Sequence, residues 1–234
     1  MTKLGIIGAM DIEVAALKEK MGNLAISTKA GMEFYEGVLE GLPVVVVQCG
    51  VGKVNAALCV QVLCDCFGVT AVVNTGIAGS LFAGLDIGDL VISRDAMYHD
   101  FDVGPFGYPI GQVPGMPLCY MADDKLMGYA VAAAEAVNPG HCQVGRVASG
   151  DQFIADKAKK EFIINHTGAI CTEMEGTAIA HAAYRNRTPF VIIRAISDKA
   201  DDSADMDYPT FERIAAQRCA QVTMTMAKRI KEAE

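Results

Sequence analysis

The chain has 234 residues, of which 52% are hydrophobic, 21% charged and 7% aromatic, and its formal net charge is −8. A chain of this size and composition buries its own apolar core, which excludes a disordered protein. The negative charge disfavours a nucleic-acid partner, because the phosphate backbone carries the same sign, and favours a small, largely uncharged substrate.

Short β-branched runs alternate with longer helical patterns. The predicted strands are Leu4–Gly8, Pro43–Cys49, Ala71–Asn74, Asp89–Arg94, Gly145–Ser149, Ala169–Thr172 and Phe190–Ala195. The predicted helices are Ile12–Met21, Lys53–Phe67, Asp123–Val137, Ala155–Ile164, Glu175–Arg187 and Tyr208–Glu232. Near-continuous apolar strands separated by helices indicate a mostly parallel sheet covered on both faces. We therefore expect residues 1–234 to form a single three-layer α/β/α domain.

Two segments depart from this alternation. Residues 28–41 are rich in aromatic and β-branched side chains and precede Gly41-Leu42-Pro43, which predicts an antiparallel hairpin and thus a mixed sheet. Residues 98–122 show no period but contain several glycines, prolines and aromatic residues. A loop of this length in a compact domain is typical of a lid, a binding loop or an interface arm, and a plain flexible insertion is the alternative.

The cysteine spacing and the first residues of the chain indicate the cellular compartment in which the protein works. None of the eight cysteines belongs to a CxxC pair, so we interpret them as small hydrophobic side chains in a reducing compartment. Met1-Thr2-Lys3 leads directly into a predicted strand instead of a signal peptide. No apolar run reaches the ~20 residues that a membrane span needs. We expect a cytoplasmic protein without a membrane anchor.

Ligands of open α/β sheets bind beyond the carboxyl ends of the strands, so the segments that follow the strands are the candidates for a site. The segment Gly8–Glu13 lacks the GxGxxG pattern of dinucleotide sites, and its acidic pair would repel a phosphate. Glycines in Gly50–Lys53 and Asn74–Gly79 allow a ligand to approach the backbone, although tight turns also use glycine. In Arg194–Asp198, a buried strand ends in a serine and a carboxylate.

Three carboxylates, Glu13, Glu175 and Asp198, are expected to meet at one edge of the sheet. Each also has a structural explanation: Glu13 and Glu175 complement helix dipoles, and Asp198 caps a helix. The residues after Asp198, 199–203, are polar and show no apolar helical pattern, which weakens the capping interpretation. Cleavage of a glycosidic bond needs such a set, one group to protonate the leaving group and one to activate water.

Six blocks in order along the chain resemble one family. They are Gly5–Met10, Gly50–Val54, Asn74–Gly79, Ser149–Ile154, Glu173–Glu175 and Arg194–Asp198. Together they resemble the 5′-methylthioadenosine/S-adenosylhomocysteine nucleosidases of the nucleoside phosphorylase superfamily. The resemblance implies a nucleoside phosphorylase-like fold. It also implies hydrolysis of the N-glycosidic bond of 5′-methylthioadenosine and S-adenosylhomocysteine, and also of 5′-deoxyadenosine. The products would be adenine and a 5-thioribose compound, and the reaction would serve methionine salvage and biosynthesis.

The resemblance also assigns catalytic roles. Asp198 would protonate N7 of adenine and would be oriented by Ser197. Glu13 would bind and activate the attacking water, with Arg194 nearby to position it. Glu175 would hydrogen-bond the ribose hydroxyls and stabilise the oxocarbenium-like sugar. No cofactor and no metal are implied, and the four histidines (99, 141, 166 and 181) show no ligand spacing.

Further residues would form the binding pocket. Phe153 would stack on the base, the main chain of Ile154 would read its edge, and Ala78 and Gly79 would lie against base and sugar. The 5′-thio substituent would lie in an apolar pocket lined by Met10, Val51, Met174 and Tyr208. The resemblance implies a homodimer, in which the long loop reaches the neighbour's pocket with Val103, Phe106, Tyr108 and Pro114.

Two positions depart from the family pattern. Ile77 stands where family members usually carry serine, and Tyr208 stands where many carry phenylalanine. Ile77 would lose a hydroxyl contact and Tyr208 would make the thioalkyl pocket more polar, so both bear on substrate preference.

Three alternatives remain open. A purine nucleoside phosphorylase would share the fold, but the carboxylates at Asp11 and Glu13 would face its phosphate where related phosphorylases place arginine. An aminodeoxyfutalosine nucleosidase would share the chemistry. A non-catalytic nucleoside-binding module would share the pocket, and the intact carboxylates argue against it.

Overall fold

The computed structural model describes residues 2–201 and 204–234, without the side chains of residues 205–207. Its helices are α1 (Asp11–Lys20), α2 (Lys53–Phe67), α3 (Asp124–Val137), α4 (Lys157–Thr167), α5 (Gly176–Asn186) and α6 (Ala204–Glu232). Its strands are β1 (Leu4–Gly8), β2 (Gly22–Lys29), β3 (Met32–Leu39), β4 (Leu42–Gln48), β5 (Ala71–Ser80), β6 (Leu90–Tyr98), β7 (Tyr120–Met121), β8 (Cys142–Ser149), β9 (Cys171–Glu173) and β10 (Phe190–Asp198).

The strands form one mixed sheet with the order β10-β6-β8-β9-β5-β1-β4-β3-β2. Strands β4, β1, β5 and β10 run parallel to one another, whereas β2, β3 and β4 form antiparallel hairpins. Because β10 also pairs with β5, the strands β5, β10, β6, β8 and β9 close into a small barrel. The predicted mixed sheet is confirmed.

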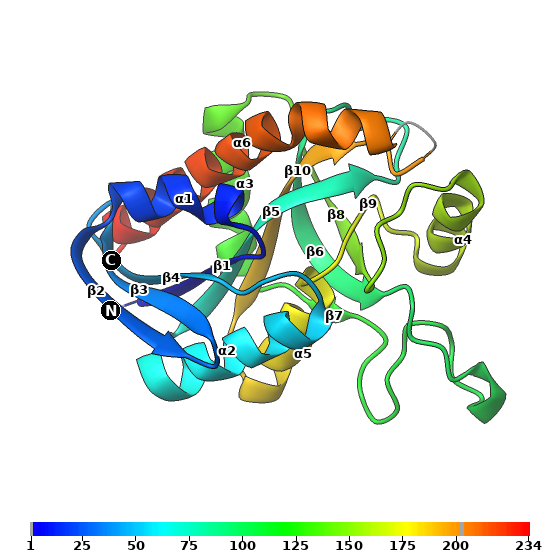
Figure 1. Cartoon of the computed structure of the whole chain (residues 1–234), viewed down its shortest axis with the longest axis horizontal. Helices are drawn as coiled ribbons and strands as arrows, with labels where there is room; N and C mark the ends of the chain where they lie inside the picture. Colours follow the sequence, from blue (N-terminus) through cyan, green and yellow to red (C-terminus); the bar gives the residue numbers. More distant parts are fainter. Residues whose placement is uncertain (1, 202–203) are drawn as a thin grey trace.

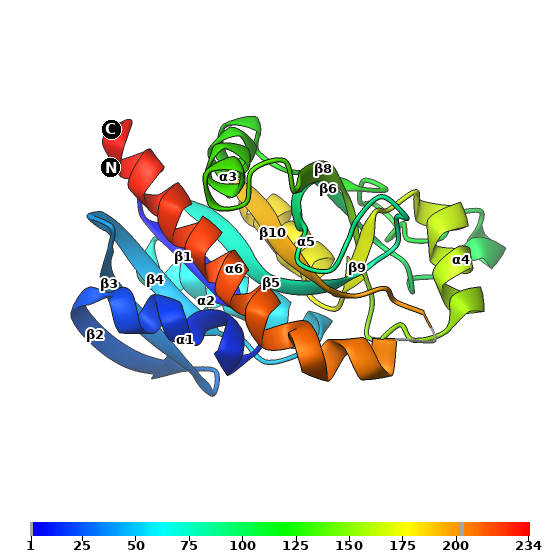
Figure 2. The ribbon, with the colours of Figure 1, turned by 90° about the horizontal axis from the view of Figure 1, so that it is seen from above.

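Helices cover both faces of the sheet. Helices α1, α3 and α6 pack together on one face, and α2 packs against α5 on the other (Figure 1). Helix α6 crosses β5 and β10 at a slant (Figure 2), and its alanines and Cys219 are buried against these strands. The residues of β1, β5, β6, β9 and β10 are almost all buried, as strands with two covered faces require. The predicted three-layer fold class is therefore confirmed.

Several boundaries differ from the sequence prediction. Strands β5 and β10 run on through Ser80 and Asp198, so the segments Asn74–Gly79 and Arg194–Asp198 lie inside strands instead of in turns. The physical reason is the barrel, in which the two segments pair with each other and β5 also pairs with β9. The antiparallel part of the sheet begins at Gly22, earlier than the predicted start at residue 28. All eight residues of β2 are exposed, so this strand has no buried run by which it could be predicted.

The chain from 98 to 122 forms loops, as predicted. It contains the 3-10 turn η1 (Gly104–Phe106) and the short strand β7, and it leaves the body of the molecule near β6 (Figure 1). Helix α6 begins four residues before its predicted start, and residues 202 and 203 of the polar stretch after Asp198 lie outside the described residues. No helix in the described part of the chain is long and apolar enough to cross a membrane.

Candidate active site

A cavity of about 400 Å³ lies where β1, β5, β9 and β10 end. All of the predicted catalytic and substrate-binding residues line it: Met10, Glu13, Val51, Ala78, Gly79, Phe153, Ile154, Met174, Glu175, Arg194, Ser197, Asp198 and Tyr208. Ile77, which the sequence analysis named as a departure from the family pattern, also lines it, and four lining residues received no role from the sequence: Ala9, Gln152, Thr172 and Glu173. The structure thus brings together segments from one end of the chain to the other.

Glu13 is held at the start of α1 by backbone donors. Its Oε2 atom accepts hydrogen bonds from the N–H groups of Ala9 (2.7 Å) and Met10 (3.0 Å), and its Oε1 atom accepts one from Ile77 (3.1 Å). A Cβ atom at Gly76 would collide with the Glu13 carboxylate, so this position of β5 needs glycine. Burial raises the pKa of Glu13, although Arg194 and the backbone donors act against it.

Arg194 is the buried cation of the site. Its Nη2 atom donates to the Oδ1 atom of Asn74 at 2.6 Å and to the Oε2 atom of Glu173, and its Nη1 atom donates to the carbonyl of Ile77 at 3.3 Å. Glu13 and Glu175 stand farther away, at 3.8 and 3.9 Å from the guanidinium nitrogens. Burial lowers the pKa of Arg194, but the three carboxylates outweigh this effect and raise it.

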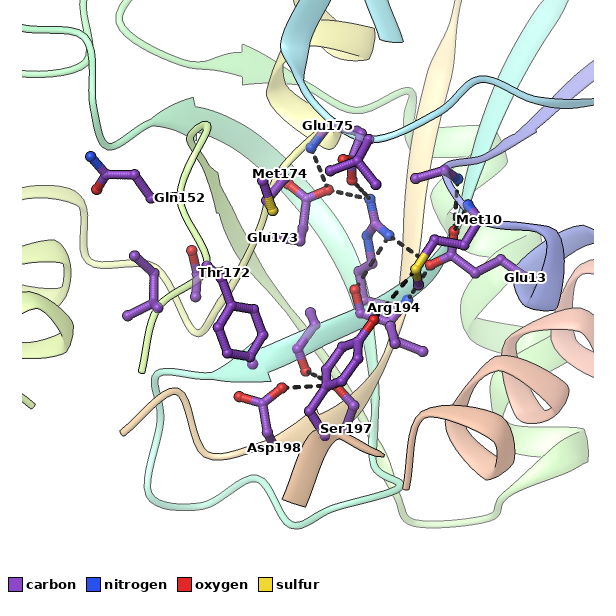
Figure 3. A pocket seen from close by; sticks show the side chains of 18 residues that line it. Met10, Glu13, Gln152, Thr172, Glu173, Met174, Glu175, Arg194, Ser197 and Asp198 are labelled. Carbon is purple, nitrogen blue, oxygen red and sulfur yellow. Dashed lines mark hydrogen bonds and ion pairs between the residues drawn. The ribbon is translucent and has the colours of Figure 1, made fainter. Parts of the chain in front are cut away.

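Glu175 occupies the N-terminus of α5 and bridges to α2. Its Oε1 atom accepts a hydrogen bond of 2.8 Å from the N–H of Gly52. Burial and the charge of Glu173 raise the pKa of Glu175 to about 7, against the effect of Arg194. Figure 3 shows Arg194 with Glu173 and Glu175 on one side and Glu13 on the other.

Asp198 ends β10 on the other side of the cavity (Figure 3). Its Oδ2 atom accepts a hydrogen bond of 2.8 Å from the hydroxyl of Ser197, and its Oδ1 atom accepts one of 2.8 Å from the N–H of Ala200. The Ser197 hydroxyl also contacts the carbonyl of Ala78 at 3.4 Å. Both acidic oxygens are thereby fixed in direction, at a position that faces the cavity.

The rest of the lining is apolar and partly open. Val51 and Phe153 are each about half exposed, at 51% and 50%, and they border the cavity. The ring of Tyr208 lies edge-on to Phe153 with centroids 5.4 Å apart, and its hydroxyl donates to the sulfur of Met10 at 3.4 Å. The side of the cavity that would take an apolar substituent therefore carries one hydroxyl.

The four residues predicted to serve a partner subunit do not line the cavity of their own chain. Val103, Phe106, Tyr108 and Pro114 lie on the loop between β6 and β7, and Phe106 is 80% exposed. Glu173, in contrast, is a central residue that the sequence reasoning did not single out. The sequence feature that could have indicated it is the block Glu173-Met174-Glu175, in which the sequence analysis assigned a function only to Glu175.

The chemistry of the cavity is that of an acid–base site. Three of its carboxylates, Glu13, Glu175 and Asp198, have oxygens fixed by hydrogen bonds, and the single arginine is already engaged by protein acceptors. No group of three or more potential metal ligands occurs within residues 2–201 and 204–234.

Comparisons with known proteins agree with this geometry. The model of the phosphorylase superfamily matches residues 3–228. A 5′-methylthioadenosine/S-adenosylhomocysteine nucleosidase of Halalkalibacterium halodurans is 43% identical over 98% of this chain and 100% of its own length.

Two solved structures are also close. The nucleosidase of the same name from Neisseria meningitidis, in complex with methylthio-immucillin-A, is 37% identical with a TM-score of 0.95, and the match covers 98% of this chain and all of that one. A futalosine hydrolase of Helicobacter pylori is 31% identical with a TM-score of 0.93, over 97% of this chain and 98% of that one. The chain belongs to the phosphorylase superfamily and, within it, to the 5′-methylthioadenosine/S-adenosylhomocysteine nucleosidases.

Proposed function

We propose that this protein hydrolyses the N-glycosidic bond of 5′-methylthioadenosine and S-adenosylhomocysteine, and of 5′-deoxyadenosine, and releases adenine. The observation that carries the proposal is the arrangement of Glu13, Glu175 and Asp198 around one cavity that contains a single, already engaged arginine. The relatives that carry this name, at up to 43% identity over nearly the whole chain, support the same reaction.

Asp198 acts as the general acid in this proposal. The hydroxyl of Ser197 and the N–H of Ala200 fix its two oxygens, so the carboxyl group keeps one orientation toward the cavity. Proton transfer from Asp198 to N7 of the purine makes adenine a neutral leaving group. Phe153 and Ile154 also line the cavity, and in this proposal the ring of Phe153 and the main chain of Ile154 bind the base.

Glu13 acts as the base that activates water. Its Oε1 atom accepts one backbone hydrogen bond, which leaves a second acceptor direction for a water molecule. Nη1 of Arg194 lies 3.8 Å from this oxygen, too far for a direct hydrogen bond, so a water bound by Glu13 also meets the guanidinium. The carboxylate takes the proton while the oxygen attacks C1′ of the ribose.

Glu175 binds the ribose hydroxyls and stabilises the cationic sugar. One of its oxygens accepts from Gly52, and the other stands 3.9 Å from Arg194, outside hydrogen-bond distance. An anionic carboxylate close to the sugar lowers the energy of an oxocarbenium-like transition state more than that of the neutral substrate. Glu175 must be ionised for this role.

The phosphorolytic alternative is disfavoured by charge. A phosphate dianion in this cavity would meet Glu13 and Glu175 with only Arg194 as a counter-charge, and that cation is bonded to Asn74 and Glu173. Like charges at such distances cost a few kcal/mol even at a moderate effective dielectric constant. Water, which is neutral, has no such penalty.

We further propose a homodimer that works in the cytoplasm, in methionine salvage and recycling. Val54 and Leu58 lie one turn apart on α2 and are 71% and 49% exposed, next to the open cavity border at Val51. Tyr184 of α5 and Phe106 of the long loop are also exposed, at 52% and 80%. Exposed apolar side chains in such numbers are typical of an interface.

The reaction is tested by incubating the protein with 5′-methylthioadenosine in phosphate-free buffer and measuring adenine by chromatography. We expect adenine and methylthioribose in equal amounts, at a rate that added phosphate does not change. Dependence on phosphate, with a sugar phosphate as product, would instead identify a phosphorylase. A parallel assay with S-adenosylhomocysteine, 5′-deoxyadenosine and aminodeoxyfutalosine ranks the substrates, and binding without any cleavage would identify a non-catalytic module.

A further inference from the structure

Glu173, the last residue of β9, makes more charged and backbone contacts than its neighbour Glu175. Its Oε2 atom accepts hydrogen bonds from the N–H groups of Glu175 (3.1 Å) and Gly176 (2.7 Å) and from Nη2 of Arg194. Its Oε1 atom accepts from the hydroxyl of Ser149. The side chain is almost fully buried, and these four donors hold both of its oxygens.

Because of these contacts, the Glu175 side chain is not needed to cap its own helix. Helix α5 has Glu175 at its N-cap position, but the Glu175 side chain makes no capping bond. Instead, the carboxylate of Glu173 accepts the N–H of Gly176 and the hydroxyl of Ser149 accepts that of Thr177, so Glu173 puts a negative charge at the positive end of the helix. The Glu175 carboxylate is thereby free to accept from Gly52 and to face the cavity.

The same contacts decide where Arg194 points. Its Nη2 atom is hydrogen-bonded to Glu173 and Asn74, whereas the other two carboxylates stand at 3.8 and 3.9 Å from the guanidinium. Without the charge of Glu173, the nearest counter-ions of the buried guanidinium would be Glu13 and Glu175. A direct ion pair with either would occupy the oxygens that the reaction uses.

We propose that Glu173 is a positioning residue: it holds Arg194 off Glu13 and Glu175 and, together with Ser149, accepts the N–H groups at the start of α5 in place of the Glu175 side chain. The inference rests on the proposed nucleosidase function, because it assigns Glu173 a part in that reaction. Its negative charge has a second effect, since it raises the pKa of Glu175. Glu173 therefore sets both the direction of Arg194 and the pH at which Glu175 ionises.

The test replaces Glu173 by glutamine, which keeps the size but removes the charge. The ionisation of Glu175 is followed by NMR of ¹³C-carboxyl-labelled glutamate, and its signal is assigned by its loss in Glu175→Gln. We expect the midpoint to fall by about one pH unit in Glu173→Gln, because a like charge is removed and Arg194 is released toward Glu175. We also expect kcat for 5′-methylthioadenosine to fall about tenfold or more, with a smaller change in KM.

Asp95→Asn is the matched control. Asp95 is also a buried carboxylate that accepts from arginines, Arg94 and Arg146, but it does not line the cavity. Its substitution should leave the Glu175 midpoint at the wild-type value. If Glu173→Gln does not fold, Glu173→Asp serves instead, since the shorter side chain keeps the charge but cannot reach all its donors. That variant should keep the midpoint within about half a unit and lose kcat.

Two outcomes would overturn the inference. An unchanged Glu175 midpoint in Glu173→Gln would show that Glu173 does not act on Glu175. A shifted midpoint with wild-type kcat, or a fully active Glu173→Asp, would show that its contacts do not serve the reaction. A wild-type protein that releases no adenine would refute the proposed function itself. The NMR titration is independent of this result, because it measures the ionisation of Glu175 and needs no turnover.

Discussion

The N–H of Gly52 donates a hydrogen bond of 2.8 Å to the carboxylate of Glu175. The contact joins the N-terminus of α2 to that of α5, although the two residues are 123 positions apart. Gly52 has a φ angle of +98°, a conformation that other residues rarely adopt, so a glycine is needed to present this N–H. This hydrogen bond holds the Glu175 carboxylate in a buried position, where ionisation costs free energy.

The raised pKa of Glu175 predicts a pH-dependent gain in stability on Glu175→Gln. The carboxyl ionises near 4.5 when unfolded and near 7 when folded, so the folded protein loses stability as pH rises between these values. The cost reaches at most about 3 kcal/mol above pH 7. Glu175→Gln should therefore raise Tm by several degrees at pH 8 and by little at pH 4.5. Calorimetry at both pH values checks this, and an equal change at both would contradict it.

Asp198→Asn should keep the fold and lose most turnover, because an amide cannot protonate the departing purine. General acid catalysis is worth roughly 10²–10⁴-fold, so kcat should fall within that range. A 7-deaza analogue of the substrate, which has no nitrogen to protonate, should also resist cleavage by the wild type. The assignment would fail if the variant stayed within about threefold of wild-type kcat, a margin far below the range expected for a general acid.

Glu13→Gln should bind substrate and fail to hydrolyse it. The amide oxygen can still accept from Ala9 and Met10, which keeps the side chain in place. The amide nitrogen loses the hydrogen bond from Ile77 and cannot take a proton from water. Ligand-detected NMR with 5′-methylthioadenosine measures binding, and adenine release measures turnover. If binding and turnover were lost together, Glu13 would shape the pocket and not activate water.

The sequence predicted the layers of the fold and the meeting of Glu13, Glu175 and Asp198 at one edge for a physical reason, whereas the other cavity residues were predicted from the family resemblance. Buried strands and amphipathic helices carry their pattern locally, and parallel strands bring their carboxyl ends to one edge. The exposed strand β2 lacked such a pattern and was missed. The barrel closure was also missed, because the pairing of β10 with β5 depends on residues more than a hundred positions apart.

At the site itself, the role of Glu173 could not be predicted from the sequence. Neighbouring glutamates at a helix start look alike in sequence, and only the folded chain shows that Glu173 turns inward to Arg194 and Ser149 while Glu175 turns to Gly52.

Tyr208→Phe tests how the Tyr208 hydroxyl, which lies in the apolar part of the cavity, affects substrate preference. The hydroxyl donates to the sulfur of Met10 at 3.4 Å, and burial raises its pKa to about 12, so it remains a neutral donor. Its removal should favour the apolar methylthio group over the charged homocysteine tail. One hydrogen bond is worth about 1 kcal/mol, so the ratio of kcat/KM for 5′-methylthioadenosine to that for S-adenosylhomocysteine should rise about fivefold. An unchanged ratio would place the hydroxyl outside substrate recognition.

The last prediction concerns the long loop and a second subunit. Phe106 is 80% exposed on the single chain, which is an apolar liability unless a partner covers it. If it completes the neighbour's 5′-substituent pocket, Phe106→Ala should raise KM for 5′-methylthioadenosine roughly tenfold, because a large apolar contact is lost. KM for adenosine, which lacks the thioalkyl tail, should change far less and serves as the control substrate.

A double alanine variant at Phe106 and Tyr108 should go further and weaken self-association, since aromatic side chains are the usual anchors of interfaces. Sedimentation velocity at low micromolar concentration compares it with the wild type, which should sediment as a dimer. The two measurements separate the two roles of the loop. A variant that remains dimeric but loses 5′-methylthioadenosine affinity would place the aromatic residues in the pocket alone, and a fully active wild-type monomer would refute both the dimer and the shared pocket.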